Sequence, residues 1–361
     1  MLFWRPCSRI SNSMKSVSPQ GLASQRVATL QSIAEAAGVH RSTAARALDP
    51  QQSHRISMEV VERVRAEAHR QGYRRDAIAA SLRTGRSRLV GVVLPDLANP
   101  VFAPILDGIA THLAGEGYSM LVADGGADEA QQTAIVGELI ARRVDGLVLA
   151  TARRQEPVLT VCLDAGVPTV LVNRMEDQLR AASVVSDDEG GMALAVEHLI
   201  GLGHRAIGHL AGPERLSTGV LRRRGFEQAM CAAGLDASAI SVATAYSRAA
   251  GQAAAAALLD RRPDLAAVAA SNDLLALGAY LEFARRGLDC PGEISIVGHN
   301  DMPLVDMVAP PLTTVRIAHD AMGRAAACLL LERLADPELA AIIRHVPAEL
   351  VLRASTAPPR R

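Results

Sequence analysis

Aromatic residues are scarce in this sequence: Phe, Trp and Tyr together make up 2% of the 361 residues, although 49% are apolar. The core must therefore be built from Ala, Val, Leu and Ile, as in helix-covered parallel sheets, and a wholly disordered chain is excluded. No apolar run approaches the roughly 18 residues that span a membrane, and the opening residues lack the apolar stretch of a secretion signal. We expect a cytoplasmic protein.

The chain also lacks the motifs of common catalytic and metal sites. The five cysteines have no CxxC spacing, which argues against a disulfide framework and against a structural zinc site. GxxxxGK(S/T), HExxH and GxSxG motifs are absent, and GLGHRAIG departs from the GxGxxG spacing of dinucleotide sites. His198, His204 and His209 fall on a helix end, a turn and a strand, which favours structural roles. We expect no enzyme activity, no metal and no cofactor.

Charges of the two signs are equal in number, 38 basic and 38 acidic residues, but they are unevenly distributed. Residues 1–88 contain fifteen Lys and Arg against six Asp and Glu, a net charge of +9. Residues 89–361 contain 23 against 32, a net charge of −9. A basic head on an acidic body suggests that the head binds a polyanion while the body does not.

Three short helical patterns occupy residues 29–72. Thr29 can cap the first helix, Gly38 separates it from the second, and Ser57 opens the third. A helix, a tight turn and a second helix form a helix-turn-helix unit, whose second helix enters the major groove of DNA.

The second of these helices carries the candidate base-reading residues. Arg41 and Ser42 lie at its start, and Arg46 follows on the same face, where a guanidinium can bond bidentately to guanine. The alternative is a charged helix face that only contacts water.

A fourth, shorter helical stretch at residues 76–83 precedes a polar joint. Leu82 is apolar and flanked by Arg83, and an apolar wedge beside arginines suits partial intercalation in the minor groove. The alternative is that Leu82 packs on Ile78, one turn earlier. About eight residues are too few to stay helical unaided, so we expect this linker to switch between helix and coil.

Beyond residue 88, apolar strands alternate with amphipathic helices, which predicts doubly wound parallel sheets in two lobes. Eight strands are expected, at residues 88–96, 118–124, 144–151, 168–174, 182–187, 206–212, 265–271 and 294–300. Because ligands of such sheets bind at the carboxyl ends of the strands, the residues there should converge on a cleft. These residues are Asp96, Asp124, Thr151, Asn173, Arg174, Asp187, Gly212, Ser271, Asn272, His299 and Asn300.

Several motifs together resemble one family. They are TLQSIAEAAGVHRSTAARALDP in the head, GLGHRAIGHLAGP, RRRGF and SNDLLALGA in the body, and SIVGHNDMPLVD with PPLTTVR near the end. In this order the chain is similar, over about residues 28–353, to the lactose-repressor and galactose-repressor (LacI/GalR) family of bacterial transcriptional regulators. The resemblance implies a homodimer that reads a pseudo-palindromic operator in double-stranded DNA, and a body like periplasmic sugar-binding proteins that closes on a small effector.

The fold class implied is an all-α helix-turn-helix head plus an α/β body of two doubly wound parallel-sheet lobes. The expected domains are a disordered N-terminal extension at 1–26, the DNA-binding head at 27–75, the hinge helix and linker at 76–88, the core at 89–355 and a tail at 356–361. Lobe 1 would comprise about 89–187 and 317–344, and lobe 2 about 188–316 and 345–355. The tail has no apolar heptad for a coiled coil, so a dimer is the default assembly.

The resemblance also assigns DNA contacts. His40 stands where the family usually has a capping Ser or Thr, and His40 can itself contact phosphate when protonated. Ala45 stands where the family often has Ser. The implied DNA-binding residues are Thr29, His40, Arg41, Ser42, Thr43, Arg46, Leu82 and Arg83.

Effector contacts are assigned in the same way. Asn300 takes the place of an aspartate that receives ligand hydroxyls in many relatives. Losing that negative charge near Arg174 and Arg222 favours an acidic ligand, and Phe102 offers a flat face for a sugar ring. For Asn272 the alternative is a helix N-cap, and for Arg222 a surface charge. The implied effector-binding residues are Asn99, Phe102, Asp124, Asn173, Arg174, Thr218, Arg222, Asn272, Asp273 and Asn300.

The function expected is a nucleoid-associated transcriptional repressor controlled by a sugar, sugar acid or other carboxylate. One alternative is a DNA-binding protein that ignores ligands and keeps a vestigial cleft. A free-standing uptake receptor is disfavoured, because it would have no use for residues 29–88.

Overall fold

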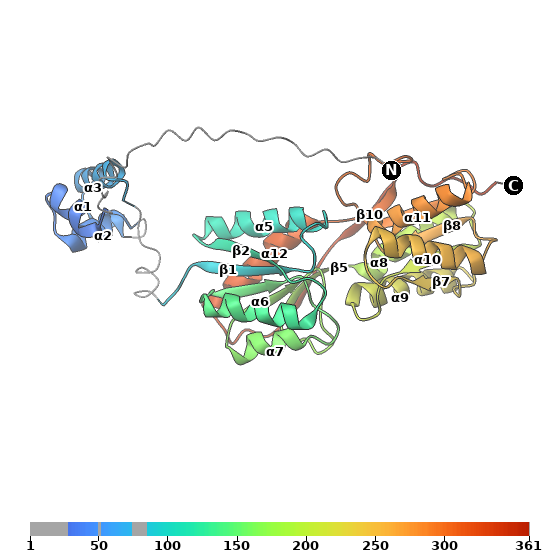
Figure 1. Ribbon diagram of the computed structural model, residues 1–361, viewed down its shortest axis with the longest axis horizontal. Helices are drawn as coiled ribbons and strands as arrows, with labels where there is room; N and C mark the ends of the chain where they lie inside the picture. Colours follow the sequence, from blue (N-terminus) through green and yellow to red (C-terminus); the bar gives the residue numbers. More distant parts are fainter. Residues whose placement is uncertain (1–27, 50–51, 74–84, 361) are drawn as a thin grey trace, which may run out of the picture. The chain divides into compact units, whose positions relative to one another are not determined.

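The computed structural model describes residues 28–49, 52–73 and 85–360. The chain divides into two units, and the boundary between them falls between residues 84 and 85. Figure 1 shows the helical first unit in blue and the larger α/β unit in the remaining colours. The expected extension at 1–26 and the hinge helix at 76–83 lie outside the described residues.

The first unit packs three α-helices around a small apolar core. The helices are α1 (Leu30–Ala36), α2 (Arg41–Ala47) and α3 (Met58–Arg70), and a 3-10 turn, η1, spans Ser53–Arg55. The core consists of Ile33, Ala34, Ala37, Ala44, Ala47, Val61, Val64 and Ala68. The predicted helix-turn-helix is therefore confirmed, with Gly38 at a positive φ of 66° in the turn.

The N-terminal caps explain why these short helices begin where they do. Thr29 forms a capping box with Ser32, because each side chain accepts a hydrogen bond from the other residue's backbone N–H. His40 caps α2: its Nδ1 accepts from the backbone N–H of Ser42 at 3.3 Å. The cap that the family usually assigns to Ser or Thr is thus supplied by His40. Ser57 precedes α3 but makes no capping bond with its side chain.

The first lobe of the larger unit is a six-stranded parallel sheet in the order β11-β5-β4-β3-β1-β2. Helices α5 and α12 pack on one face, and α6 and α7 on the other. The elements are β1 (Leu89–Leu94), α5 (Phe102–Gly115), β2 (Ser119–Asp124), α6 (Glu129–Ala141), β3 (Gly146–Leu149), α7 (Pro157–Asp164), β4 (Thr169–Val172), β5 (Ala182–Ser186), α12 (His319–Ala335) and β11 (Ile343–Val346).

The second lobe repeats this architecture in the order β12-β10-β9-β8-β6-β7, where only β12 is antiparallel to its neighbour. Helices α10 and α11 pack on one face, and α8 and α9 on the other. The elements are α8 (Asp188–Gly201), β6 (Ile207–Ala211), α9 (Ser217–Ala232), β7 (Ile240–Val242), α10 (Arg248–Arg261), β8 (Ala267–Ala270), α11 (Asp273–Arg286), β9 (Ser295–Asn300), β10 (Thr313–Ile317) and β12 (Ala348–Val351). The predicted two-lobed α/β body is confirmed.

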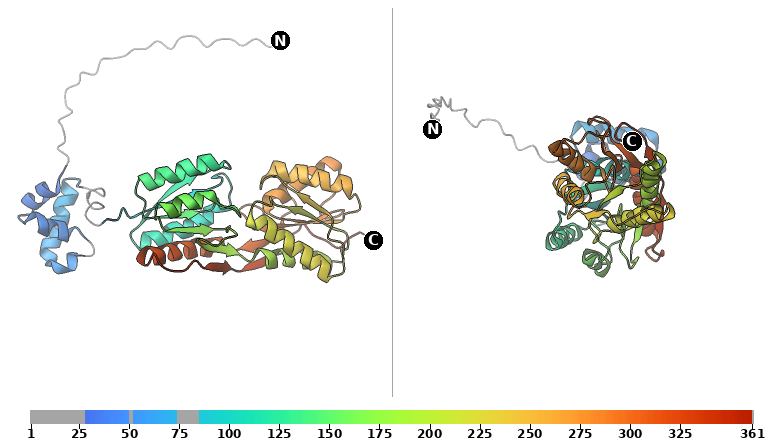
Figure 2. Two further views of the ribbon diagram at one scale, coloured as in Figure 1. Left: turned by 90° about the horizontal axis from the view of Figure 1, so that it is seen from below. Right: turned by 90° about the vertical axis from the view of Figure 1, so that its right-hand side faces the viewer.

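The chain crosses between the lobes three times, between β5 and α8, between β10 and α12, and between β11 and β12 (Figure 2). β11 pairs with β5, so residues 345 and 346, which the sequence-based range put in lobe 2, lie in the sheet of lobe 1. Three neighbouring connections of this kind form a hinge, because small φ/ψ changes in them can rotate one lobe against the other.

The small side chains anticipated from the composition allow close helix packing. A Cβ atom on Gly108 of α5 would collide with the carbonyl oxygen of Asp320 in α12, and one on Gly323 would collide with that of Ile105. In the second lobe, Gly278 of α11 meets the backbone of Arg248 in the same way. A core without many aromatic residues is therefore compact because the helices approach closely.

All eight expected strands are present, and four further strands were missed. Three of these are β7, β10 and β11, whose sequences ISV, TTVRI and IRHV are short or polar, and the fourth is the edge strand β12. β7, β11 and β12 are edge strands, which tolerate polar residues, whereas β10 is central and buried but has the polar sequence TTVRI. None of the described helices has the length and apolar character required to cross a bilayer.

Candidate functional site

The candidate DNA-reading surface is the outer face of α2. Arg41, Ser42 and Arg46 are exposed, whereas Ala44 and Ala47 face the core. Within the described part of the head, Arg41 and Arg46 form no hydrogen bond or ion pair with their side chains. Both guanidinium groups are therefore available to an external partner, as expected from their spacing along the helix.

The side chains of the other implied DNA-binding residues differ in burial and in the hydrogen bonds that they form within the head. The hydroxyl of Thr29 accepts the capping bond from Ser32 N at 3.1 Å, and the Ser42 hydroxyl lies 2.8 Å from His40 Nδ1. Thr43 is half-buried. Leu82 and Arg83 lie outside the described residues.

A cavity of about 220 Å³ lies between the lobes of the larger unit, at the carboxyl ends of strands from both sheets. The strand-end rule therefore located the cleft correctly. Its lining residues are Pro95, Asp96, Asn99, Gly126, Ala127, Gln132, Thr151, Arg153, Arg174, Arg215, Leu216, Ala245, Tyr246 and Ser247.

Of the ten expected effector residues, Asn99 and Arg174 line this cavity. Thr218 lies directly behind it, because its hydroxyl accepts a bond at 3.2 Å from the hydroxyl of the lining residue Tyr246. Asp124 is at the end of β2 and is exposed, and its carboxylate accepts from the backbone N–H of Gly126 at 3.0 Å.

The structure gives three expected effector residues a role within the fold. Phe102 is 2% exposed and lies in the core of lobe 1, so it presents no ring face to the cavity. Asn272 caps α11 by accepting from Leu275 N at 2.9 Å, the alternative considered for it. Asp273 is fully buried, and its carboxylate accepts from Met302 N at 2.8 Å and from the Thr314 hydroxyl at 2.5 Å.

Arg222 forms a buried ion pair instead of a surface charge. Its Nε lies 2.8 Å from Asp188 Oδ1, and its Nη1 donates to the Ser271 carbonyl at 2.6 Å. The pair joins α9 to the start of α8, next to the first crossover. Arg222 therefore acts on the hinge region, and in this structure it does not line the cavity.

Two asparagines at strand ends complete the expected set. Asn173 and Asn300 are each 8% exposed and have positive φ values of 67° and 118°. Asn300 Oδ1 lies 3.4 Å from His299 Nδ1. Such backbone conformations are uncommon outside glycine and cluster at functional sites.

Sequence reasoning missed seven polar lining residues. Asp96 and Thr151 had been identified as strand ends without being assigned to the effector. The remaining five lie in loops or on a helix, where no apolar run marks a position; these are Gln132, Arg153, Arg215, Tyr246 and Ser247. The loop positions follow strand ends closely, which is the signal that would have found most of them.

Two hydrogen bonds donated by backbone N–H groups bridge the lobes beside the cavity. Arg154 N donates to Arg215 O at 3.0 Å, and Met175 N donates to Ser217 Oγ at 3.1 Å. Movement of one lobe against the other would lengthen or break these bonds.

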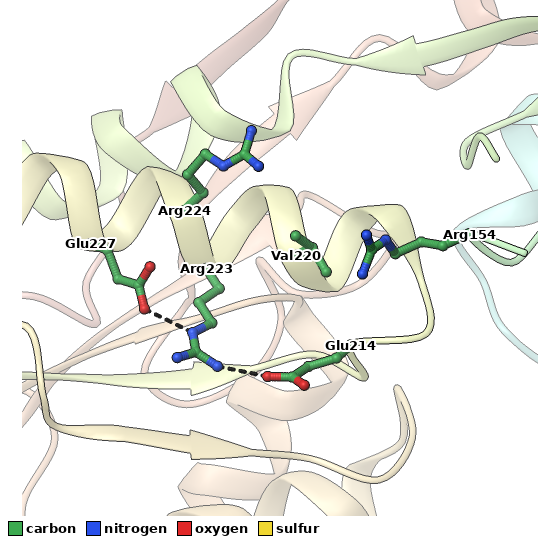
Figure 3. A pocket seen from close by; sticks show the side chains of 6 residues that line it. All are labelled: Arg154, Glu214, Val220, Arg223, Arg224 and Glu227. Atoms are coloured by element: carbon green, nitrogen blue, oxygen red, sulfur yellow. Dashed lines mark hydrogen bonds and ion pairs between the residues drawn. The ribbon is translucent and has the colours of Figure 1, made fainter. Parts of the chain in front are cut away.

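A second pocket of about 290 Å³ lies beside α9, where Arg154 of lobe 1 extends toward Val220 (Figure 3). Its charged side chains are paired with each other or with close neighbours: Arg223 bonds to Glu214 and Glu227, and Arg154 to Asp177. This pocket therefore offers fewer free groups to a ligand than the interlobe cavity does.

Comparisons with known proteins agree with this architecture. The model of a periplasmic binding protein-like domain matches residues 196–356. The transcriptional regulator MalR of Streptomyces coelicolor is 34% identical over 342 residues, covering 91% of this chain and 96% of MalR. The lac repressor dimer bound to operator and an anti-inducer has a TM-score of 0.82 at 27% identity and covers 92% of this chain and 100% of its own. The CelR–cellobiose complex has a TM-score of 0.71 at 29% identity, with 91% and 99% covered.

A helix-turn-helix head followed by a periplasmic-binding-protein-like body defines a DNA-binding transcriptional regulator. Because the chain is related to MalR along almost its whole length, it belongs to the LacI/GalR family.

Proposed function

We propose that two copies of the chain bind a pseudo-palindromic operator as a repressor, and that a small effector in the interlobe cavity controls this binding. The observation that carries the proposal is the cavity itself, formed by strand ends of two lobes that three crossovers allow to rotate. The head would comprise residues 27–75 and the hinge residues 76–88, with Leu82 and Arg83 as minor-groove contacts. The protein would act on the bacterial nucleoid, in the cytoplasm, without enzyme activity.

Effector control is favoured over a vestigial cleft because the cavity remains open and lined by polar side chains from both lobes. The related structure of CelR holds cellobiose, which supports a sugar or sugar derivative as effector. Footprinting on DNA upstream of the gene, with and without sugars and sugar acids, tests the proposal. Protection that no ligand alters would favour the ligand-independent alternative, and the absence of any protected site would contradict operator binding.

Base reading by α2 can be tested at Arg46. Replacing Arg46 by Ala is expected to weaken operator binding by about 1–3 kcal/mol and to relax the base preference at one position, because a bidentate contact to a base edge is lost. Fluorescence anisotropy with the operator and its single-base variants measures both effects. Arg65 is exposed on α3 and provides the matched control: Arg65→Ala should leave the preference unchanged. An unaltered preference in Arg46→Ala would remove Arg46 from the base-reading set.

The dimer is supported by an exposed apolar surface on lobe 2. In the loop after β9, Leu304 is 66% exposed and Met307 is 77% exposed. Leu281 on α11 is also exposed, and its neighbour Tyr280 donates a bond to the Pro310 carbonyl of the same loop. Large apolar side chains gathered in this way mark protein–protein contacts.

Replacing Met307 by Glu is expected to convert the dimer to a monomer, because dimer formation would then bury a carboxylate in an apolar contact. Operator affinity should fall by about tenfold or more, since one head alone contacts a single half-site. Analytical ultracentrifugation and anisotropy measure the two effects. Leu194→Glu, at an exposed leucine of α8, is the control and should remain dimeric. A dimeric Met307→Glu variant would contradict the proposed interface.

A further inference from the structure

The interlobe cavity carries an excess of positive charge. Three of its lining residues are arginines, Arg153, Arg174 and Arg215, and Asp96 is the single acidic residue among the described residues that line it. Asp96 is exposed, and its Oδ1 accepts from Ala98 N at 2.8 Å within its own loop. In the described part of the chain, no ion pair joins Asp96 to any of these three arginines.

Two of the arginines are held by groups at the edge of the cavity. Arg153 donates to the Ala127 carbonyl at 2.7 Å and lies 3.3 Å from the half-exposed carboxylate of Glu129. Arg215 donates to the Thr244 carbonyl at 3.2 Å and makes no ion pair within the described chain. The carbonyl partners orient both guanidinium groups, and of the two only Arg153 also has an acidic partner.

Arg174 differs from both, because its Nε is buried and has no hydrogen-bond partner in the described structure. Burial, the largest cause, together with repulsion by the nearby Arg215 and Arg222, lowers the pKa of Arg174 to about 10. The group still carries its charge near neutral pH. The side chain as a whole is partly exposed. A partly buried cation without an acidic partner is unfavourable, so such a group usually marks a place where a ligand or ion completes the pairing.

The buried carboxylates of Glu156 and Asp188 are engaged with other groups. Glu156 is buried, and its two oxygens accept from the backbone N–H groups of Arg153 at 2.7 Å and Val158 at 3.1 Å. Asp188 holds Arg222. The protein thus neutralises Arg222 with an internal partner and leaves Arg174 without one.

We propose that the effector of this cleft is an anion: a small polyhydroxylated acid whose carboxylate, or an equivalent phosphate, pairs with the guanidinium of Arg174. Arginine binds both groups bidentately through its planar fork. The neutral side chains of Asn99, Gln132 and Ser247 supply donors and acceptors for hydroxyl groups. This assignment depends on the effector site proposed above and specifies the class of ligand it takes.

Isothermal titration calorimetry of the full-length protein with matched pairs of ligands tests the ligand class. The probes are D-glucose with D-gluconate and D-glucose 6-phosphate, and D-galactose with D-galactonate and D-galacturonate. At least one acid should bind about tenfold or more tightly than its neutral counterpart, and its affinity should fall with added salt. A carboxylate source and a phosphate source are distinguished by which acid of the glucose set binds.

The variant Arg174→Met tests the pairing in two ways, one of which needs no ligand. It should weaken the binding of the acid by about tenfold or more. It should also raise the Tm of the ligand-free protein by about 2–4 °C, because an unpaired, partly buried charge is replaced by an apolar side chain. The matched control is Arg142→Met, at an exposed arginine that ends α6 at the opposite end of the first sheet; it should change neither quantity.

Several outcomes would overturn the ligand class. They are tighter binding of a neutral sugar than of its acid, no binding of any acid at about 10 mM, or a lowered Tm in ligand-free Arg174→Met. Operator binding measured on the same samples separates this inference from the function on which it depends. If a neutral sugar releases the operator, the regulatory proposal stands and the anion assignment fails. If an acid binds through Arg174 without altering operator affinity, the assignment stands and effector control fails.

Discussion

Replacing Asp188 by Asn is expected to lower the free energy of unfolding by about 3–5 kcal/mol, since removal of one partner of a buried ion pair leaves the other charge uncompensated. Asp188 and Arg222 have side chains that are 1% and 3% exposed, and their Oδ1 and Nε atoms are 2.8 Å apart. Asp188 Oδ1 also accepts from the Ser186 hydroxyl at 2.9 Å, so the substitution disturbs more than one bond. The Tm of the larger unit should fall by roughly 10 °C.

Two variants make this prediction specific. In the double variant Asp188→Asn/Arg222→Met neither charge of this pair remains, so more than half of the lost stability should return. The surface pair of Arg224 and Glu189 has nearly the same separation, 2.9 Å, but side chains that are 56% and 32% exposed. Glu189→Gln should therefore change stability by less than about 1 kcal/mol. Equal losses in Asp188→Asn and Glu189→Gln, measured by urea unfolding, would show that burial does not set the strength of the pair.

Acidification from about pH 7 to about pH 5 is expected to destabilise the larger unit by a few kcal/mol through three buried histidines. Burial is the main cause that lowers the pKa of His209 and of His319 to about 4, and it lowers the pKa of His299 well below its usual value. Repulsion by the positive charge of Arg222 is the second cause of the lowered pKa of His299 and His319.

The hydrogen bonds of the histidines are those of neutral rings. His209 Nδ1 lies 2.8 Å from the Ala269 carbonyl, so it carries the proton, and its Nε2 accepts from the Ser271 hydroxyl at 3.2 Å. Nε2 of His299 and of His319 is buried without a partner in the described structure. A proton added to either atom would create a buried cation with no acceptor.

The direction of the stability change follows from the pKa values of the histidines in the unfolded and the folded chain. The unfolded chain binds a proton at each histidine near pH 6.5 and the folded chain only near pH 4, so stability is complete above 6.5 and is lost as the pH falls toward 4. His209 and His319 should each lose about 2 kcal/mol at pH 5. Asp273 acts in the opposite direction, because burial raises its pKa to about 7 and its stabilising contribution grows as the pH falls below 7. This gain is about 2 kcal/mol and offsets part of the loss.

Chemical unfolding at several pH values measures the effect. The variant His319→Gln should have a flatter pH profile on the acid side than the wild-type protein, because one depressed histidine is removed. His345→Gln replaces an exposed histidine of β11 and should leave the profile unchanged. Identical acid limbs in wild type and His319→Gln would contradict a buried neutral ring at this position.

The sequence predicted the fold well where its elements are continuous and apolar. The strand LVGVVL of β1 is buried from its second residue to its last and stands out against its flanks, whereas IRHV of β11 is half-buried and carries two polar side chains. β11 and β12 are held by their neighbours in the sheet, which sequence periodicity does not register. β11 and β12 therefore became clear only from their pairing with strands far away in the chain.

The candidate site, too, was predicted from the sequence only in part. The strand-end rule identified the cleft and pointed to Asp96, Thr151 and Arg174, because parallel strands bring their carboxyl ends to one edge. The family resemblance assigned Arg174 and Arg222 the same role at the effector. In the structure Arg222 has a buried acidic partner and Arg174 has none.

By itself the sequence determined the class of protein: a basic helix-turn-helix head, an acidic body of two parallel sheets, and a ligand site where their strands end. These features follow from periodicity, charge and short motifs, which are local along the chain. Only the tertiary structure decided which charges in the body neutralise each other and which remain available to a ligand. That depends on distances and burial between residues of different strands and helices, and these are set when the two sheets pack.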